Sequence, residues 1–129
     1  RPTLAVCVGL QLLCESSEES PEAKGLGILP VRVTRFDESA PTVPQLGWNE
    51  ISCDPECSLL EDGFAYFANS YKMPTAPEGW AAAWSEHGQR FVAAVERGSV
   101  LACQFHPELS GALGKSILAR WVARAKESA

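Results

Sequence analysis

The feature that most constrains the fold is the junction between a short apolar run and a helix start near the beginning of the chain. Leu4, Ala5 and Val6 form the apolar run, Cys7 follows it, and Gly9 comes two residues later. An apolar run, a glycine and then three closely spaced leucines predict a buried strand, a tight turn and the first turn of a helix. The side chain of Cys7 would point out of that turn.

The rest of the chain carries mainly strand and loop signals and ends in a helix. We predict strands over 28–36, 63–71, 80–84, 91–95 and 99–105, a loop over 15–27, an irregular or edge-like segment over 37–47, a turn at 96–98 and a helix over 111–126. A strand and helix, several antiparallel strands and a final strand and helix place the chain in the α/β class.

Composition excludes several classes of protein. The 129 residues fit one domain, and with 46% hydrophobic and 21% charged residues the chain is of ordinary globular type. A net charge of −5 without a basic run predicts no nucleic-acid partner. No apolar run approaches the roughly 20 residues that span a bilayer, and no signal peptide is apparent. We therefore expect no membrane association and a cytoplasmic location.

The five cysteines are an odd number in a chain large enough to form an ordinary core, which argues against a disulfide framework. Cys53 and Cys57 have the spacing of half a metal site, but no second close pair of ligands accompanies them. We predict reduced thiols and neither a metal nor another cofactor.

Two segments carry side chains suited to catalysis. Cys7 lies at the predicted strand–helix junction, where a helix N-terminus would help to stabilise a thiolate. His106 follows the strand predicted over 99–105, and Glu108 is close enough in sequence to fold back on the imidazole. A thiol, a histidine and an acid can form a nucleophilic triad. Each residue also has a plainer interpretation, Cys7 as a buried structural cysteine and His106 as a surface histidine. His87 is expected in an exposed turn without a role.

Taken together, the two segments resemble class I glutamine amidotransferases. Residues 6–13 are similar to the nucleophile turn of that family, and residues 104–108, which read Gln-Phe-His-Pro-Glu, are similar to its His and Glu segment. Three further pieces resemble the histidine-biosynthesis branch of the family: Ser17-Glu18-Glu19, Gly47-Trp48-Asn49 and Asn69-Ser70-Tyr71. The resemblance extends from Ala5 to Trp121.

The resemblance implies a flavodoxin-like mixed sheet and a single glutaminase domain over residues 1–129. Cys7 would attack the side-chain amide of glutamine, His106 would shuttle the proton to the departing ammonia, and Glu108 would orient His106. The residues that the resemblance assigns to glutamine binding are Gln11, Glu19, Ser70 and Tyr71. The ammonia would pass to a (β/α)8-barrel cyclase, either a separate subunit or a fused domain. The residues that would contact this partner are Trp48, Asn49 and Tyr66.

The chain departs from the family pattern at several points. Ala5 replaces a usual glycine, Leu109 a common lysine and Asn69 a usual histidine. Family members also carry a further segment before the nucleophile turn, with a glycine-rich loop that helps to build the oxyanion hole. We therefore expect this chain to be the C-terminal portion of its domain, and inactive or weakly active by itself. Two alternatives remain, the glutaminase of another class I amidotransferase and a non-catalytic scaffold or fragment.

Overall fold

The computed structural model describes residues 1–127 of the chain. In chain order its elements are β1 (Thr3–Val6), α1 (Val8–Leu13), β2 (Cys14–Ser17), β3 (Leu29–Arg35), β4 (Gln45–Cys53), β5 (Gly63–Asn69), β6 (Tyr71–Lys72), β7 (Ala81–Glu86), β8 (Arg90–Arg97), β9 (Val100–Cys103), the 3-10 turn η1 (Pro107–Leu109) and α2 (Gly111–Glu127).

The strands form a large and a small sheet. The large sheet has the order β1-β9-β8-β7-β4-β5, and the small one has the order β2-β3-β6. In the large sheet β1 and β9 are parallel, whereas every other neighbouring pair is antiparallel. The predicted α/β class with a mixed sheet is therefore confirmed. These pairings also make β1, β9 and β5 run in the same direction, so their carboxyl ends share one edge.

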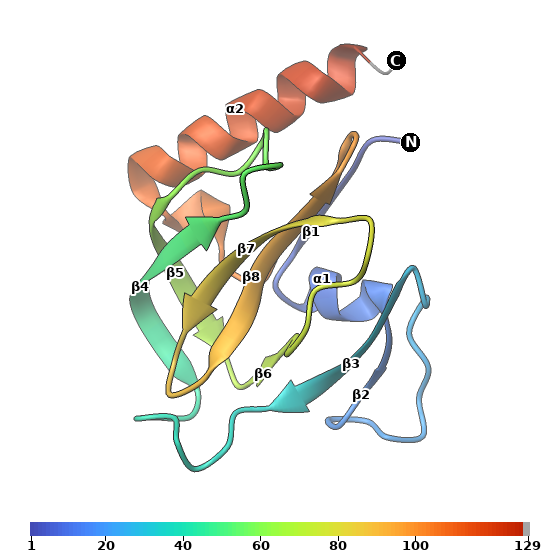
Figure 1. The fold of residues 1–129 in the computed structure, drawn as a ribbon, viewed down its shortest axis with the longest axis vertical. Coiled ribbons are helices and arrows are strands. Elements are labelled where there is room, and N and C mark those ends of the chain that lie inside the picture. Colours follow the sequence, from blue (N-terminus) through green and yellow to red (C-terminus); the bar gives the residue numbers. More distant parts are fainter. Residues whose placement is uncertain (128–129) are drawn as a thin grey trace.

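The large sheet is covered on both faces (Figure 1). Helix α2 packs through Ile117 on one face, and helix α1 and the small sheet pack on the other. Strand β8 contributes to both cores, Phe91 and Ala93 to the first and Val92 and Val95 to the second. A strand segment buried on both faces is expected to be apolar throughout, as residues 91–95 of β8 are.

The predicted strands over 28–36, 63–71, 80–84, 91–95 and 99–105 each overlap an observed strand, and the final helix is confirmed as α2. Strand β4 was not predicted, because its polarity is inverted. Gln45 is only 3% exposed, whereas Leu46 and Trp48 are 69% and 57% exposed. A strand that buries an amide and exposes large apolar side chains lacks the usual alternation signal.

Three further local predictions were wrong. The turn predicted at 96–98 lies instead at 98–99, and Glu96 belongs to β8, where it is almost fully buried. Its carboxylate accepts hydrogen bonds from the backbone N–H groups of residues 58–60, which explains how the fold accommodates a buried charge there. Strand β2 occupies the start of the loop predicted over 15–27, and Tyr71 lies in β6 rather than at the end of β5.

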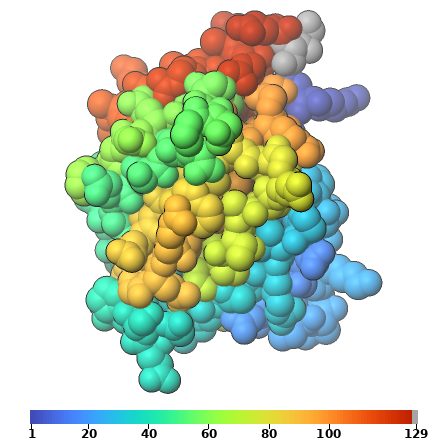
Figure 2. Space-filling model, in the orientation of Figure 1, coloured from blue at the N-terminus to red at the C-terminus, as the bar shows by residue number. Residues whose placement is uncertain are grey.

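The beginning of the chain and helix α2 lie at the same end of the molecule (Figure 2). Trp121 Nε1 of α2 donates hydrogen bonds to Thr3 O and Ser99 O, which ties the helix to β1 and to the turn before β9. No helix within residues 1–127 is long and apolar enough to cross a bilayer.

The contact between η1 and α2 leaves no space for a side chain at Gly114. A Cβ atom at this position would lie 1.8 Å from Pro107 O, well inside van der Waals contact. Gly114 N–H also donates to Ser110 O at 3.2 Å. The close approach fixes η1, which follows His106 directly, against the first turns of α2.

We predict that Gly114→Ala lowers the free energy of unfolding by about 1–3 kcal/mol, because the clash outweighs the better helix propensity of alanine. Chemical denaturation measures this change. Ser116→Ala, on the exposed side of the same helix, is the matched control and should change stability by less than about 0.5 kcal/mol. Equal stability of the two variants would contradict the packing argument.

Candidate active site

Cys7 occupies a strained turn between β1 and α1. Its backbone has φ 55° and ψ −108°, and it is the one residue other than glycine with a positive φ in residues 1–127. Such a conformation costs on the order of 1–3 kcal/mol and persists only where the surroundings enforce it. Here Cys7 N–H donates to Cys103 O at 2.7 Å, which fastens the turn to β9. The predicted strand–turn–helix junction is therefore confirmed.

The parallel pairing of β1 and β9 brings the two predicted catalytic segments to one edge of the sheet. Val6 pairs with Cys103, so Cys7 and Gln104 leave their strands side by side. His106 follows two residues later, and its N–H donates to Tyr66 O of β5 at 2.9 Å. The sheet therefore curls far enough for its edge strand β5 to contact the segment after β9.

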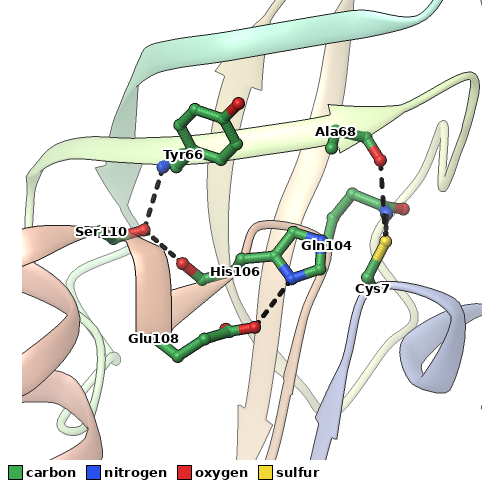
Figure 3. A network of polar contacts seen from close by, with 7 residues as sticks. All are labelled: Cys7, Tyr66, Ala68, Gln104, His106, Glu108 and Ser110. Carbon is green, nitrogen blue, oxygen red and sulfur yellow. Dashed lines mark hydrogen bonds and ion pairs between the residues drawn. The ribbon is translucent and has the colours of Figure 1, made fainter.

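Ser110 anchors the His106 segment (Figure 3). Its Oγ donates to His106 O at 2.6 Å and accepts from Tyr66 N–H at 2.9 Å. These two bonds connect η1, β5 and the backbone of His106. A buried serine that bridges two segments fixes the direction in which the histidine leaves the sheet.

Glu108 folds back on His106, as the His-Pro-Glu spacing predicts. The distance from His106 Nδ1 to Glu108 Oε2 is 3.0 Å. A carboxylate that accepts from Nδ1–H leaves Nε2 free of a proton and able to receive one. The pair can therefore serve as an oriented general base.

Cys7 Sγ has two hydrogen-bonding neighbours at the same edge. It lies 3.8 Å from Ala68 O of β5, to which it donates, and 3.8 Å from Gln104 Nε2, from which it accepts. Neither of these bonds involves His106. Among the residues drawn in Figure 3, the thiol and the imidazole therefore belong to two hydrogen-bond networks that are not connected to each other.

Burial raises the pKa of the Cys7 thiol above its ordinary value of 9.0, and the charge of Glu108 adds to this effect. Hydrogen bonds from Val8 N–H and Gln104 act in the opposite direction but are smaller. The expected stabilisation of a thiolate at the start of α1 is thus present at Val8, yet burial outweighs it. Near neutral pH the thiol keeps its proton, so an attack by Cys7 requires a base.

Two of the predicted glutamine-binding residues, Gln11 and Glu19, line a cavity of about 180 Å³ beside α1. Gln11 Nε2 donates at 3.0 Å to Tyr71 O and at 3.0 Å to Gln104 Oε1. Tyr71 thus reaches the site through its carbonyl group. Ser70 O accepts from Phe36 N–H, and neither Ser70 nor Tyr71 is among the described residues that line this cavity.

A larger cavity, of about 550 Å³, lies beside β4 and His87. His87 Nε2 lies 2.7 Å from Thr42 O, and its ring packs edge-on against Phe36 at 4.9 Å. Neither Cys7 nor the His106–Glu108 pair lines this cavity. These three residues do not line the smaller cavity either, but Val8 and Gln11 of α1, the helix that directly follows Cys7, form part of its wall.

The three residues predicted to contact a partner lie together on β4 and β5. Trp48 pairs with Tyr66 across the strands, and their rings meet edge to face with centroids 6.0 Å apart. Asn49 Nδ2 donates to Gln45 Oε1 at 2.8 Å and to Glu86 O at 2.7 Å. We use the term apolar strip for the exposed side chains of Leu46, Trp48, Phe64 and Leu109.

All five cysteines are free thiols. Cys53 and Cys57 are hydrogen-bonded to each other, and burial raises the pKa of both, that of Cys57 to about 11. Within residues 1–127 no three His, Cys, Asp or Glu side chains come together in a way that could hold a metal ion. Cys53 and Cys57 are half-buried, as Cys7 is, whereas Cys14 and Cys103 are buried.

Comparison with known proteins identifies similar sequences over nearly the whole chain. The model of the family described as glutamine amidotransferase class-I matches residues 1–125. Imidazole glycerol phosphate synthase subunit HisH of Carboxydothermus hydrogenoformans is 42% identical over 122 residues, which are 92% of this chain and 60% of that protein. The corresponding subunit of Gloeobacter violaceus is 45% identical over 132 residues, 97% of this chain and 58% of that protein.

The chain spans only part of each of these relatives. It covers 22% of the chloroplastic imidazole glycerol phosphate synthase hisHF of Arabidopsis thaliana, with 42% identity over 128 residues. A crystal structure of a glutamine amidotransferase superposes with a TM-score of 0.65 at 23% identity, over 95% of this chain and 60% of that one. At this identity the superposition shows the fold alone.

The raised pKa predicts how Cys7 reacts with iodoacetamide. Its alkylation rate should still rise with pH through pH 9, because the thiolate fraction increases up to a pKa above 9.0. Cys7 should react about tenfold or more faster than Cys14, which is fully buried and has a pKa of about 12. Peptide mapping by mass spectrometry measures both rates. A rate for Cys7 that levels off near pH 7 would contradict this description of the site.

Proposed function

Because the chain belongs to the class I glutamine amidotransferase family, we propose that it carries the glutaminase site of an imidazole glycerol phosphate synthase. The observation that carries this proposal is that Cys7 and the His106–Glu108 pair follow the parallel strands β1 and β9 at the same edge of the sheet. The names of the relatives, which are 42–45% identical, support the choice of this branch of the family.

In the proposed reaction His106 Nε2 takes the proton from Cys7 Sγ as the sulfur attacks the side-chain amide carbon of glutamine. The tetrahedral intermediate collapses when the carbon–nitrogen bond breaks, and His106 gives its proton to the departing ammonia. Water, activated by the same imidazole, then hydrolyses the glutamyl thioester to glutamate and restores the thiol. The raised pKa of Cys7 supports this order, because the proton leaves only when a base is in place.

The substrate pocket of this proposal is the cavity beside α1. The carboxylate of Glu19 suits the ammonium group of glutamine, and the amide of Gln11 suits its polar groups. The backbone N–H of Val8, directly after the nucleophile, is positioned to donate to the oxyanion of the intermediate. Tyr71 supports the pocket indirectly by accepting from Gln11, and Ser70 remains assigned to it by resemblance alone.

The proposed partner is a (β/α)8-barrel cyclase that uses the released ammonia. Its docking face would be the apolar strip together with Asn49 and Tyr66. Leu109 of the strip belongs to η1, the turn that carries Glu108, so a partner docked there lies close to the point of ammonia release. Exposed aromatic side chains beside other apolar groups are typical of the core of an interface.

Two further parts of the proposal concern the domain and its location. Residues 1–129 would form the C-terminal portion of one glutaminase domain, and the coverage of only about 60% of the bacterial relatives supports this placement. The five free thiols support a reducing compartment, which we propose is the cytoplasm.

We predict that Cys7→Ala lowers glutamine hydrolysis on the order of 10⁴-fold or more, and Glu108→Gln about 10²–10⁴-fold. Glutamine at position 108 can still accept from Nδ1–H but does not stabilise the imidazolium. Glutamate release by the full-length protein, with a barrel cyclase present, measures both effects. Cys57→Ser is the matched control and should stay within about twofold of the parent protein. Full activity of Cys7→Ala would refute the proposed mechanism.

We predict that Trp48→Ala weakens binding of the cyclase about tenfold or more, because truncating an aromatic residue at an interface centre typically removes over 1 kcal/mol. Titration calorimetry with the purified cyclase measures the affinity. Val122→Ala removes an exposed apolar side chain from α2 and should leave the affinity unchanged. If both variants bind as tightly as the parent, the partner does not dock on the apolar strip.

A further inference from the structure

Side-chain amides form a continuous chain of hydrogen bonds from the surface of β4 to the nucleophile. The chain begins at Asn49, beside Trp48 of the apolar strip, and ends at Cys7. In its outer half, Asn49 Nδ2 donates to Gln45 Oε1 at 2.8 Å, Gln45 Nε2 to Asn69 Oδ1 at 3.0 Å, and Asn69 Nδ2 to the backbone Tyr71 O at 3.0 Å. In its inner half, Gln11 Nε2 donates to the same Tyr71 O and to Gln104 Oε1, at 3.0 Å each. Gln104 Nε2 then donates to Cys7 Sγ at 3.8 Å.

The inner members of this chain are buried amides. Gln45, Asn69 and Gln104 are 3%, 5% and 0% exposed. Each of them accepts through its oxygen and donates through its nitrogen within the chain. A buried amide without partners costs several kcal/mol, so removing one member leaves its neighbours unsatisfied. This dependence holds every member in one orientation.

The arrangement has a definite effect on Cys7. Gln104 Nε2 donates to the sulfur, and a donor favours the thiolate over the thiol. Gln104 Oε1 in turn accepts from Gln11, and a hydrogen bond accepted at the carbonyl polarises the amide and strengthens its N–H as a donor. The same donor fixes where the sulfur lies relative to Val8 N–H and Ala68 O.

We infer that Gln104 is a positioning residue for the nucleophile, and that the amide chain connects its orientation to Asn49 at the surface. The inference deepens the proposed function, since Cys7 is the nucleophile of that proposal. A partner group that draws the Asn49 amide away from Gln45 removes the first donor of the chain. The amide chain therefore provides a physical route from the half-buried Asn49 of β4 to the sulfur.

The test is the pH profile of Cys7 alkylation by iodoacetamide, read by peptide mapping in the full-length protein. Gln104→Met keeps the shape of the side chain but removes both hydrogen bonds. We expect it to slow alkylation of Cys7 at pH 8 by about threefold to tenfold and to move the profile to higher pH. Cys14 of the same molecules is the internal standard and should keep its rate.

Gln89→Met is the matched control. Gln89 Oε1 accepts a hydrogen bond from Asp37 N–H, but Gln89 is not a member of the amide chain. Asn49→Leu tests the surface end at a half-buried position that the fold tolerates more readily than position 104. Asn49→Leu should also lower the alkylation rate of Cys7, by about twofold or more. This variant tests the inference if Gln104→Met does not fold.

A Cys7 profile that is the same in Gln104→Met as in Gln89→Met overturns the role of Gln104. An unchanged profile in Asn49→Leu overturns the connection to the surface. Equal changes at Cys7 and Cys14 indicate general loosening and also overturn the inference. Because alkylation needs no glutamine, a parent protein that fails to hydrolyse glutamine would refute the proposed function while leaving this test intact.

Discussion

The site depends on the parallel pairing of β1 with β9. This pairing is the one parallel contact of the large sheet, and it sends the chain out of both strands at the same edge. The hydrogen bond from Cys7 N–H to Cys103 O extends the pairing by one residue into the strained turn. An antiparallel arrangement of these strands would place the thiol and the imidazole at opposite edges, a full strand length apart.

The site depends also on the curl of the large sheet. Strand β5 lies at the edge opposite β1, yet Tyr66 O accepts from His106 N–H and Ala68 O lies within reach of Cys7 Sγ. The carbonyl groups of an otherwise unpaired edge therefore hold both halves of the site. This closure also satisfies backbone groups that an open edge would leave to solvent or to other chains. The same strand carries Tyr66 and Phe64, so the proposed docking face and the proposed site share one strand.

The sequence permits prediction of those parts of the site that depend on neighbouring residues. The turn at Cys7 follows from an apolar strand, a glycine and a helix start, and the His106–Glu108 contact follows from two residues of separation. Gln104 could not be assigned in this way, because its partner Gln11 is 93 residues away and its own neighbours read as an apolar strand. Strand β4 was missed because it exposes Trp48 and buries Gln45, which reverses the signal on which strand prediction relies. The contact of Gln104 and the burial of Gln45 both arise only in the folded chain.

Glu108 has two opposed effects on the proton that moves in the proposed reaction. Its carboxylate orients His106 through Nδ1, but its charge also raises the pKa of Cys7 and disfavours a thiolate. A free thiolate beside a carboxylate is therefore suppressed, whereas transfer of the proton from sulfur to His106 leaves a cation next to Glu108. The charge of Glu108 therefore disfavours loss of the thiol proton to solvent more than its transfer to His106. The polarised donor Gln104 offsets part of that penalty at the sulfur, which is why a buried amide is useful where an apolar side chain would pack as well.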